Sequence, residues 1–181
     1  MIIVLFGAPG VGKGTQAALL AERKHIPHLS TGDALRRAIA SQSELGIVAK
    51  KIVESGKLVS DEIVTGIVKE ALSKPEFANG CILDGFPRNQ SQAEALDVIL
   101  QETQKEIYRV ININVENEEI VNRMLKRGRK DDAEDVIRHR LEIYNNQTAP
   151  LLNYYTNSGK LTTIDGNADV EEVYERIDDI L

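Results

Sequence analysis

Closely spaced glycines surround a lysine near the start of the chain. Gly7, Gly10, Gly12, Lys13 and Gly14 fall within one short segment that ends in Thr15. Glycines let successive backbone N–H groups crowd around phosphate oxygens, and the lysine adds a full positive charge. The strict form of this pattern has Ser or Thr directly after the lysine, where this chain has Gly14. The spacing still predicts a loop that holds nucleotide phosphates.

A dense group of cations lies between positions 123 and 140 of an otherwise acidic chain. Its members are Arg123, Lys126, Arg127, Arg129, Lys130, Arg138 and Arg140. Guanidinium groups stabilise the charge that spreads over the oxygens of a moving phosphoryl group. On one helix, Arg138 and Arg140 would project about 200° apart, and periodicity alone does not choose which of them faces a cleft. The cluster as a whole indicates phosphoryl transfer.

Short apolar runs predict the strands that must position these groups. We expect strands at 2–6, 27–29, 81–83, 107–113 and 161–164. Because strand and helix alternate, we expect an α/β fold with a parallel sheet, helices on both faces and ligands outside the carboxyl ends of the strands. The polar loops at 7–15, 30–33 and 84–88 follow the first three strands. They should therefore meet at one edge of the sheet.

The size of the chain limits it to one domain with a small insertion. It has 181 residues, 42% of them hydrophobic, which is enough for one sizeable core. The segment 30–59 reads as mainly helical and contains no strand, and Gly46 and Gly56 interrupt it. We interpret this segment as an inserted, mobile subdomain.

Composition excludes several classes of function. The net charge of −6 argues against nucleic-acid binding, which needs a basic surface. No run is long enough to span a bilayer, and the amino-terminal apolar run is too short for a signal peptide. The single Cys81 is expected to be a small buried hydrophobe. We therefore expect a cytoplasmic protein without nucleic-acid or membrane partners.

Several motifs occur in order along the chain, namely the glycine-rich loop, the segments 30–33, 57–59 and 83–88, Gln92, and the segment 127–132. Together they make the chain resemble a bacterial adenylate kinase. The resemblance covers nearly the whole chain, and Gly14 is usual among nucleoside monophosphate kinases. It implies a P-loop three-layer α/β fold, with a five-stranded parallel sheet flanked by helices. It also implies a core of 1–29, 60–126 and 133–181, a nucleoside monophosphate-binding subdomain at 30–59 and a very short lid at 127–132.

The activity that the resemblance implies is reversible transfer of the terminal phosphoryl group of ATP to AMP, giving two ADP. For ATP it assigns Gly10, Val11, Gly12, Lys13, Gly14, Thr15, Arg123, Arg127 and the backbone at Gly166, which would meet the adenine. For AMP it assigns Thr31, Arg36, Lys57, Leu58, Val59, Gly85, Phe86, Pro87, Arg88, Gln92, Arg129 and Arg140. The catalytic set is Lys13, Arg88, Arg127, Arg129 and Arg140, while Arg138 becomes a surface residue.

Magnesium is the expected cofactor, bound with ATP. It keeps most of its waters, so Asp84 is expected to hold it through water, and Thr15 is a further candidate. A zinc lid is excluded, because one cysteine cannot build it and His25, His28 and His139 lack ligand spacing. No general base is needed, because the phosphate of AMP is already largely dianionic at neutral pH.

Two alternatives stay open at this point. A UMP/CMP kinase would share the phosphate loop and the arginines, but such enzymes typically carry Ala and Asn where this chain has Thr31 and Gln92. A P-loop switch that hydrolyses ATP slowly would leave Thr31, Arg36, Arg88 and Gln92 unexplained. The expected partners are therefore ATP, AMP and ADP, and the chain is expected to be a monomer.

Overall fold

A five-stranded sheet runs through the middle of the molecule, as seen in a computed structural model that describes residues 1–181. Its strands are β1 (Ile2–Phe6), β2 (His28–Ser30), β3 (Cys81–Asp84), β4 (Ile107–Asn114) and β5 (Leu161–Asp165). They lie in the order β2-β3-β1-β4-β5, and every neighbouring pair is parallel. The predicted parallel sheet is confirmed, although β2 begins one residue late and β3, β4 and β5 run one residue longer than predicted.

Helices follow the strands and fill the connections between them. They are α1 (Lys13–Lys24), α2 (Thr31–Ala40), α3 (Glu44–Glu54), α4 (Asp61–Leu72), α5 (Gln90–Glu102), α6 (Asn117–Arg127), α7 (Glu134–Ile143), α8 (Leu151–Asn157) and α9 (Val170–Asp178). A 3₁₀ turn, η1 (Pro75–Phe77), precedes β3, and a π-helical turn, η2 (Tyr144–Thr148), continues α7. None of the helices is long and apolar enough to cross a membrane.

The alternating side chains of β1 divide the interior into two hydrophobic clusters. Ile2, Val4 and Phe6 pack into one cluster with residues of α4, α5 and α8. Ile3 and Leu5 pack into the other, with residues of α1, α6, α7 and α9. A strand that is apolar on both faces suits a parallel sheet covered by helices on both sides. The result is the predicted three-layer architecture, with Cys81 buried in its centre as expected.

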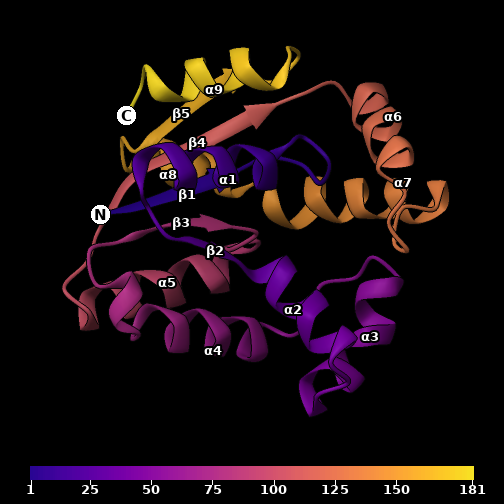
Figure 1. Ribbon diagram of the computed structural model, residues 1–181, viewed down its shortest axis with the longest axis horizontal. Coiled ribbons are helices and arrows are strands. Elements are labelled where there is room, and N and C mark those ends of the chain that lie inside the picture. Colours follow the sequence, from indigo (N-terminus) through magenta and orange to yellow (C-terminus); the bar gives the residue numbers. More distant parts are fainter.

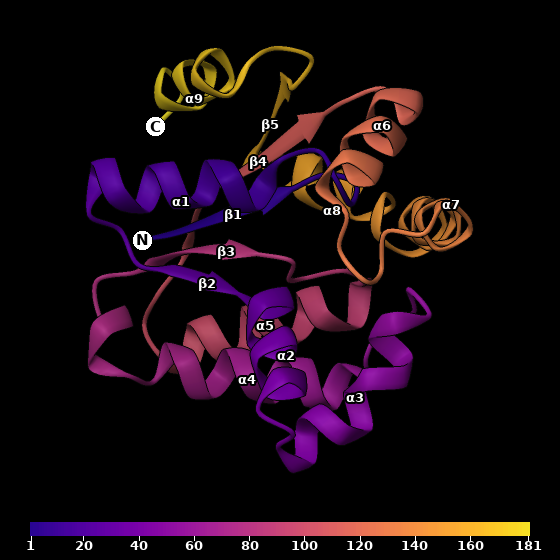
Figure 2. The same cartoon turned by 45° about the vertical axis from the view of Figure 1, so that its right-hand side comes forward.

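The carboxyl ends of the strands lead directly into polar loops and helix starts. Ser30 ends β2 and caps α2, because its hydroxyl accepts a hydrogen bond from the backbone N–H of Asp33 at 3.2 Å. Asn89 caps α5 in the same way, accepting from the backbone N–H of Gln92 at 2.9 Å. Both views place the α2–α3 and α6–α7 pairs on one side of the molecule, beyond the arrowheads of the strands (Figures 1 and 2).

The segment between β2 and α4 forms the helix pair α2–α3, and a glycine lets the two helices meet. A Cβ on Gly46 would lie 2.0 Å from the carbonyl oxygen of Ala38, so any larger residue would separate them. Leu35 and Ala49 of this pair belong to the same hydrophobic cluster as α4 and α5. The pair therefore packs on the helix layer that contains α4 and α5, at the edge where the strands end.

Candidate active site

A cavity of about 840 Å³ lies at this edge of the sheet. The loop before α1, the loop after β3 and the facing parts of α6 and α7 line it. A second cavity of about 60 Å³ adjoins it beside α2 and the loop at 56–59. The two cavities share lining residues, namely Gly32, Arg36, Gly56, Leu58, Gly85, Arg88 and Arg140. The three polar loops, which were expected to meet at one edge of the sheet, therefore do meet there.

Backbone geometry suits the loop before α1 to binding an anion. Gly12 precedes the helix with a φ of 104°, a conformation that L side chains rarely adopt, although a Cβ there would meet nothing within 4 Å. No side chain caps α1, so its first N–H groups remain available at the positive end of the helix dipole. Gly10, Val11, Gly12, Lys13, Gly14 and Thr15 all line the large cavity.

Lys13 is folded back onto the loop that carries it. Its ammonium group donates to the carbonyl oxygens of Gly7 at 2.7 Å and Ala8 at 2.8 Å. Burial lowers the pKa of Lys13 to about 8, opposed by Asp84 and assisted by the charges of Arg88, Arg140 and Arg127. The lysine is therefore a cation among cations, and a phosphate placed beside it would relieve this repulsion.

Thr31 and Arg88 meet at a single carbonyl group on the other side of the cavity. The Gly85 oxygen accepts from the Arg88 Nε at 2.7 Å and from the Thr31 hydroxyl at 3.0 Å. Gly85 has a φ of 83°, and a Cβ there would lie 2.9 Å from the Thr31 hydroxyl oxygen. Burial and the charge of Arg36 lower the pKa of Arg88, while Asp84 raises it. This loop holds a guanidinium group that lines both cavities.

Gln92 lies in the wall of the small cavity, with both ends of its amide engaged. Its oxygen accepts from the backbone N–H of Arg88, and its nitrogen donates to Asp61, each at 2.8 Å. The side chain is 1% exposed. An amide nitrogen has a second N–H and the oxygen a second lone pair, so its contact with adenine stays a prediction. Thr31, Lys57, Leu58 and Val59 line the same small cavity, while Phe86 and Pro87 line the large one.

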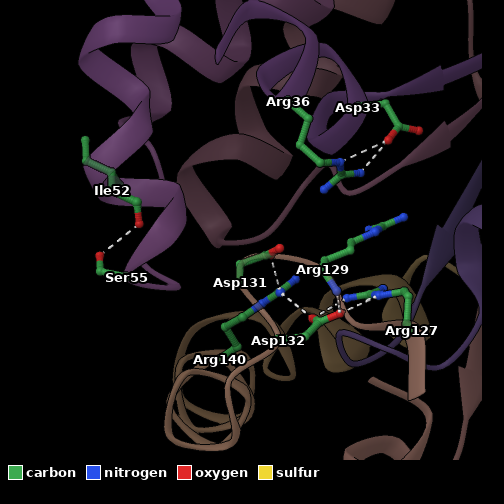
Figure 3. Close-up of polar contacts among 9 residues, drawn as sticks. All are labelled: Asp33, Arg36, Ile52, Ser55, Arg127, Arg129, Asp131, Asp132 and Arg140. Carbon is green, nitrogen blue, oxygen red and sulfur yellow. Dashed lines mark hydrogen bonds and ion pairs between the residues drawn. The ribbon is translucent and has the colours of Figure 1, made fainter. Parts of the chain in front are cut away.

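Carboxylates hold two of the arginines that face the large cavity, Arg127 and Arg140 (Figure 3). Arg127 donates twice to Asp132, at 2.9 and 2.7 Å, and Arg140 donates to Asp131 at 2.6 Å. These two aspartates are 6% and 8% exposed. Phosphate oxygens offer guanidinium groups the same kind of bidentate acceptor. Asp131 and Asp132 therefore hold the two arginines where they line the large cavity.

Arg129 is the least restrained of the arginines that line the large cavity. Its backbone N–H donates to Asp132 at 3.0 Å, but its guanidinium group makes no hydrogen bond to the protein. Figure 3 shows this side chain between Arg127 and the pair formed by Arg36 and Asp33, whose closest atoms are 2.5 Å apart. Burial and the charges of Arg127 and Arg36 lower the pKa of Arg129. The guanidinium group is thus available to an anion in the cavity.

The helix α7 turns its two arginines in different directions. Arg140 lines both cavities, and its side chain is 16% exposed. Arg138 is 54% exposed and pairs with Glu134, one turn earlier on the same helix. The structure therefore makes the choice between Arg138 and Arg140 that periodicity left open.

Gly166 is the one residue of the predicted set that lines neither cavity. Its N–H donates to the Asn114 carbonyl at 2.7 Å, and its carbonyl accepts from Arg123 at 3.0 Å. Arg123 itself lines the large cavity, as do Ala168, Asp169 and Val170 just after Gly166. Contact of the Gly166 backbone with adenine stays a prediction.

Asp84 is the carboxylate beside Lys13 and the loop glycines. One of its oxygens would lie 3.5 Å from a Cβ on Gly14, and it lies 3.7 Å from the His28 Nε2. Burial acts to raise the pKa of Asp84, but His28, Lys13 and Arg88 hold it below its ordinary value. No three His, Cys, Asp or Glu side chains gather to form a metal site. A single ionised carboxylate fits a magnesium ion that arrives with phosphates and keeps its waters.

Sequence reasoning missed part of the lining. Tyr144 and Thr148 of the π turn η2, Glu119 of α6 and Gln16 of α1 all line the large cavity. The amide of Gln16 donates to the carbonyl of Val170 at 2.9 Å and so joins α1 to the first residue of α9. None of these residues belongs to a recognisable motif, and periodicity cannot show that η2 departs from the α-helix.

Comparison with known proteins gives one consistent result. The family described as adenylate kinase matches residues 5–160. Adenylate kinase 1 of a Nostoc species is 51% identical over 94% of this chain and 93% of its own length. Adenylate kinase 1 of a Synechocystis species is 48% identical over 99% of this chain and 96% of its own. The adenylate kinase of Oenococcus oeni is 46% identical, with 97% and 94% covered.

Proposed function

The chain belongs to the adenylate kinase family, and we propose that its two adjoining cavities bind the two nucleotides of the family's reaction. The chain transfers the terminal phosphoryl group of ATP to AMP and forms two ADP. What remains to be assigned is the part that each residue plays. The observation that carries the assignment is that Lys13 and six arginines face one cavity, which continues into the pocket beside Thr31 and Gln92.

We propose that ATP lies along the loop before α1. Its phosphates would receive N–H groups from Gly12, Gly14 and Thr15, which line the cavity at the start of α1. Lys13 would leave the carbonyls of Gly7 and Ala8 for the terminal phosphates, since a phosphate would offset the burial and the repulsion that together lower its pKa. Arg123 and Arg127 would lie on the same side of the cavity.

AMP would occupy the small cavity, with its phosphate directed toward the large one. Thr31, Leu58, Val59 and Gln92 would surround the base and ribose, while Arg36 and Arg88 would hold the phosphate, because both arginines line both cavities. Lys57, Gly85, Phe86 and Pro87 complete this side of the proposed site.

The transferring group would pass between the two nucleotides under Arg129 and Arg140. Their guanidinium groups stabilise charge on the phosphoryl oxygens in the transition state, and the protein needs no base because the acceptor is a dianion. A switch that only hydrolyses ATP would have no use for this second set of residues. The same set fits AMP better than a pyrimidine nucleotide through Thr31 and Gln92.

Magnesium is part of the proposal. Asp84 would hold the ion through water when it arrives with ATP, and Thr15 would be a further contact at the cavity wall. When bound, the ion supplies charge stabilisation of the phosphates. The protein's part is to present one ionised carboxylate beside Lys13, which the low pKa of Asp84 supports.

The predicted organisation also stays a proposal. We propose that 30–59 moves as a subdomain over AMP and that 127–132 acts as a short lid over ATP, both closing on a core of 1–29, 60–126 and 133–181. Closure would exclude water that could otherwise hydrolyse ATP. We further propose that the chain works as a monomer in the cytoplasm. Sedimentation at micromolar concentration would test whether it is a monomer.

The test of the function is a panel of acceptors. AMP, CMP, UMP and GMP are each offered with Mg-ATP, and the formation of ADP is followed. We expect AMP to be the preferred acceptor by kcat/KM. A preference for CMP or UMP would reject the assignment of the small cavity, and ADP formation that is independent of any acceptor would reject phosphoryl transfer to a nucleotide.

A further inference from the structure

Thr148 contacts the acceptor loop from a part of the chain far away in sequence. Its hydroxyl donates to the carbonyl oxygen of Arg88 at 2.6 Å, and its side chain is among the buried polar groups of the protein, at 7% exposure. This is the hydrogen bond by which η2 is joined to the loop after β3. The bond therefore ties the end of α7 to the residue proposed to hold the AMP phosphate.

The backbone of Arg88 is held on both sides. Its N–H donates to the Gln92 amide oxygen at 2.8 Å, and its carbonyl accepts from Thr148. Its side chain is held as well, because its Nε donates to the Gly85 carbonyl at 2.7 Å. These three bonds leave the outer nitrogens of the guanidinium group as its unused donors. A guanidinium group held in this way loses little freedom when it binds a phosphate.

The π turn explains how Thr148 reaches this position. Thr148 lies eight positions after Arg140, so in a regular α-helix their side chains would point about 80° apart. In η2 the N–H of Ala149 instead donates to the Tyr144 carbonyl, five residues back, at 2.8 Å. This wider turn rotates less per residue and brings Thr148 back toward the face of Arg140. Both residues line the large cavity, and π turns occur frequently at functional sites.

From this geometry we infer that Thr148 is a positioning residue, whose hydroxyl fixes the backbone of Arg88 so that its guanidinium group is already placed for the acceptor phosphate. The inference rests on the proposed role of Arg88 in binding AMP. Because α7 and η2 are continuous, one element carries both Arg140 and the group that positions Arg88. The arginines on the two sides of the transferring group thereby share one support.

The first test compares Thr148→Val, which keeps the shape but loses the hydroxyl, with Thr148→Ser, which keeps the hydroxyl. Calorimetric titration is used to measure the dissociation constants of AMP and Mg-ATP separately. Thr148→Val should weaken AMP binding about tenfold, because a buried carbonyl loses its donor and the Arg88 backbone is released. ATP affinity should change less than about twofold, and Thr148→Ser should bind AMP nearly as the parent does.

Control variants separate this effect from general damage. Thr103 also donates its hydroxyl to a helix carbonyl, at 2.8 Å to Ile99, but lies outside both cavities. Thr103→Val should therefore leave both affinities unchanged. If Thr148→Val does not fold, Thr148→Ala against Thr148→Ser gives the same contrast, since both lose the methyl group and only Ser keeps the hydroxyl.

Arg88→Ala distinguishes the two ways of failing. If it leaves AMP affinity unchanged, the proposed role of Arg88 is wrong. If it weakens AMP binding while Thr148→Val binds AMP like the parent, only the inference about Thr148 is overturned. An equal loss of AMP and ATP affinity in Thr148→Val, or a loss in Thr148→Ser as large as in the valine variant, would also overturn it.

Discussion

Comparing Arg140→Ala with Arg138→Ala distinguishes a cation that faces the reacting phosphates from one that faces solvent. The two arginines share α7, but the Arg140 side chain is 16% exposed and lines both cavities, whereas the Arg138 side chain is 54% exposed. Removing one donor to transition-state charge costs about 2.7–4 kcal/mol, so Arg140→Ala should lower kcat about 100- to 1000-fold. Arg138 lines neither cavity and its exposed ion pair contributes only about 0–1 kcal/mol to stability, so Arg138→Ala should change kcat less than about twofold.

Stability must be measured beside activity, because Arg140 also has a structural partner. Its loss leaves Asp131, whose side chain is 11% exposed, without its 2.6 Å hydrogen bond. An unsatisfied group of this kind costs about 1–3 kcal/mol of unfolding free energy. Thermal unfolding of both variants sets the temperature at which each is fully folded. Arg140→Lys should remain impaired, because an ammonium group keeps the charge but not the planar fork.

The assay follows initial rates of ADP formation with saturating Mg-ATP and AMP. The ratio of the two kcat values is the quantity of interest, since it cancels errors common to both preparations. Equal losses in the two folded alanine variants, or a larger loss at position 138, would refute the assignment of Arg140 to the transferring group.

Three further outcomes concern Lys13 and Thr31. Lys13→Met should lower turnover by about 1000-fold or more without lowering the unfolding midpoint, because burial already penalises the charge of Lys13; near-normal turnover would reject its role. Since the pKa of Lys13 is lowered from 10.5 to about 8, its charge is lost as the pH rises through that value, and kcat/KM for ATP should fall roughly tenfold per unit above it. A kcat/KM for ATP that stays constant from pH 7 to 9.5 would contradict this prediction. Thr31→Ala should reduce the preference for AMP over CMP, measured as the ratio of kcat/KM values, and an unchanged ratio would count against a contact between Thr31 and the base.

Local sequence signals were sufficient for the fold. The apolar run that forms β1 and the glycines after it define a strand, a turn and a helix start through rules that act over a few residues. Strand ends were less well predicted, because Ser30, Asp84, Asn114 and Asp165 continue the ladder only through pairing with a neighbouring strand. That pairing is a tertiary property.

The candidate site was predictable where a motif carried it and not elsewhere. Lys13, Arg88 and Arg140 were found from motif and resemblance, and each lines the large cavity. No local pattern indicates that Asp131 and Asp132 hold arginines, since their role depends on the path of the loop after α6. Thr148 was missed because its partner lies 60 residues away and because the π turn that orients it leaves no pattern in the sequence.

The most direct test of the account is the interconversion of ADP with ATP and AMP, followed by phosphorus NMR. With magnesium present, the purified protein should convert ADP into equal amounts of ATP and AMP, and a mixture of ATP and AMP should reach the same final composition from the other side. No inorganic phosphate should accumulate. If ADP is left unchanged, or if ATP is lost to inorganic phosphate instead, two nucleotides do not exchange a phosphoryl group in this cavity.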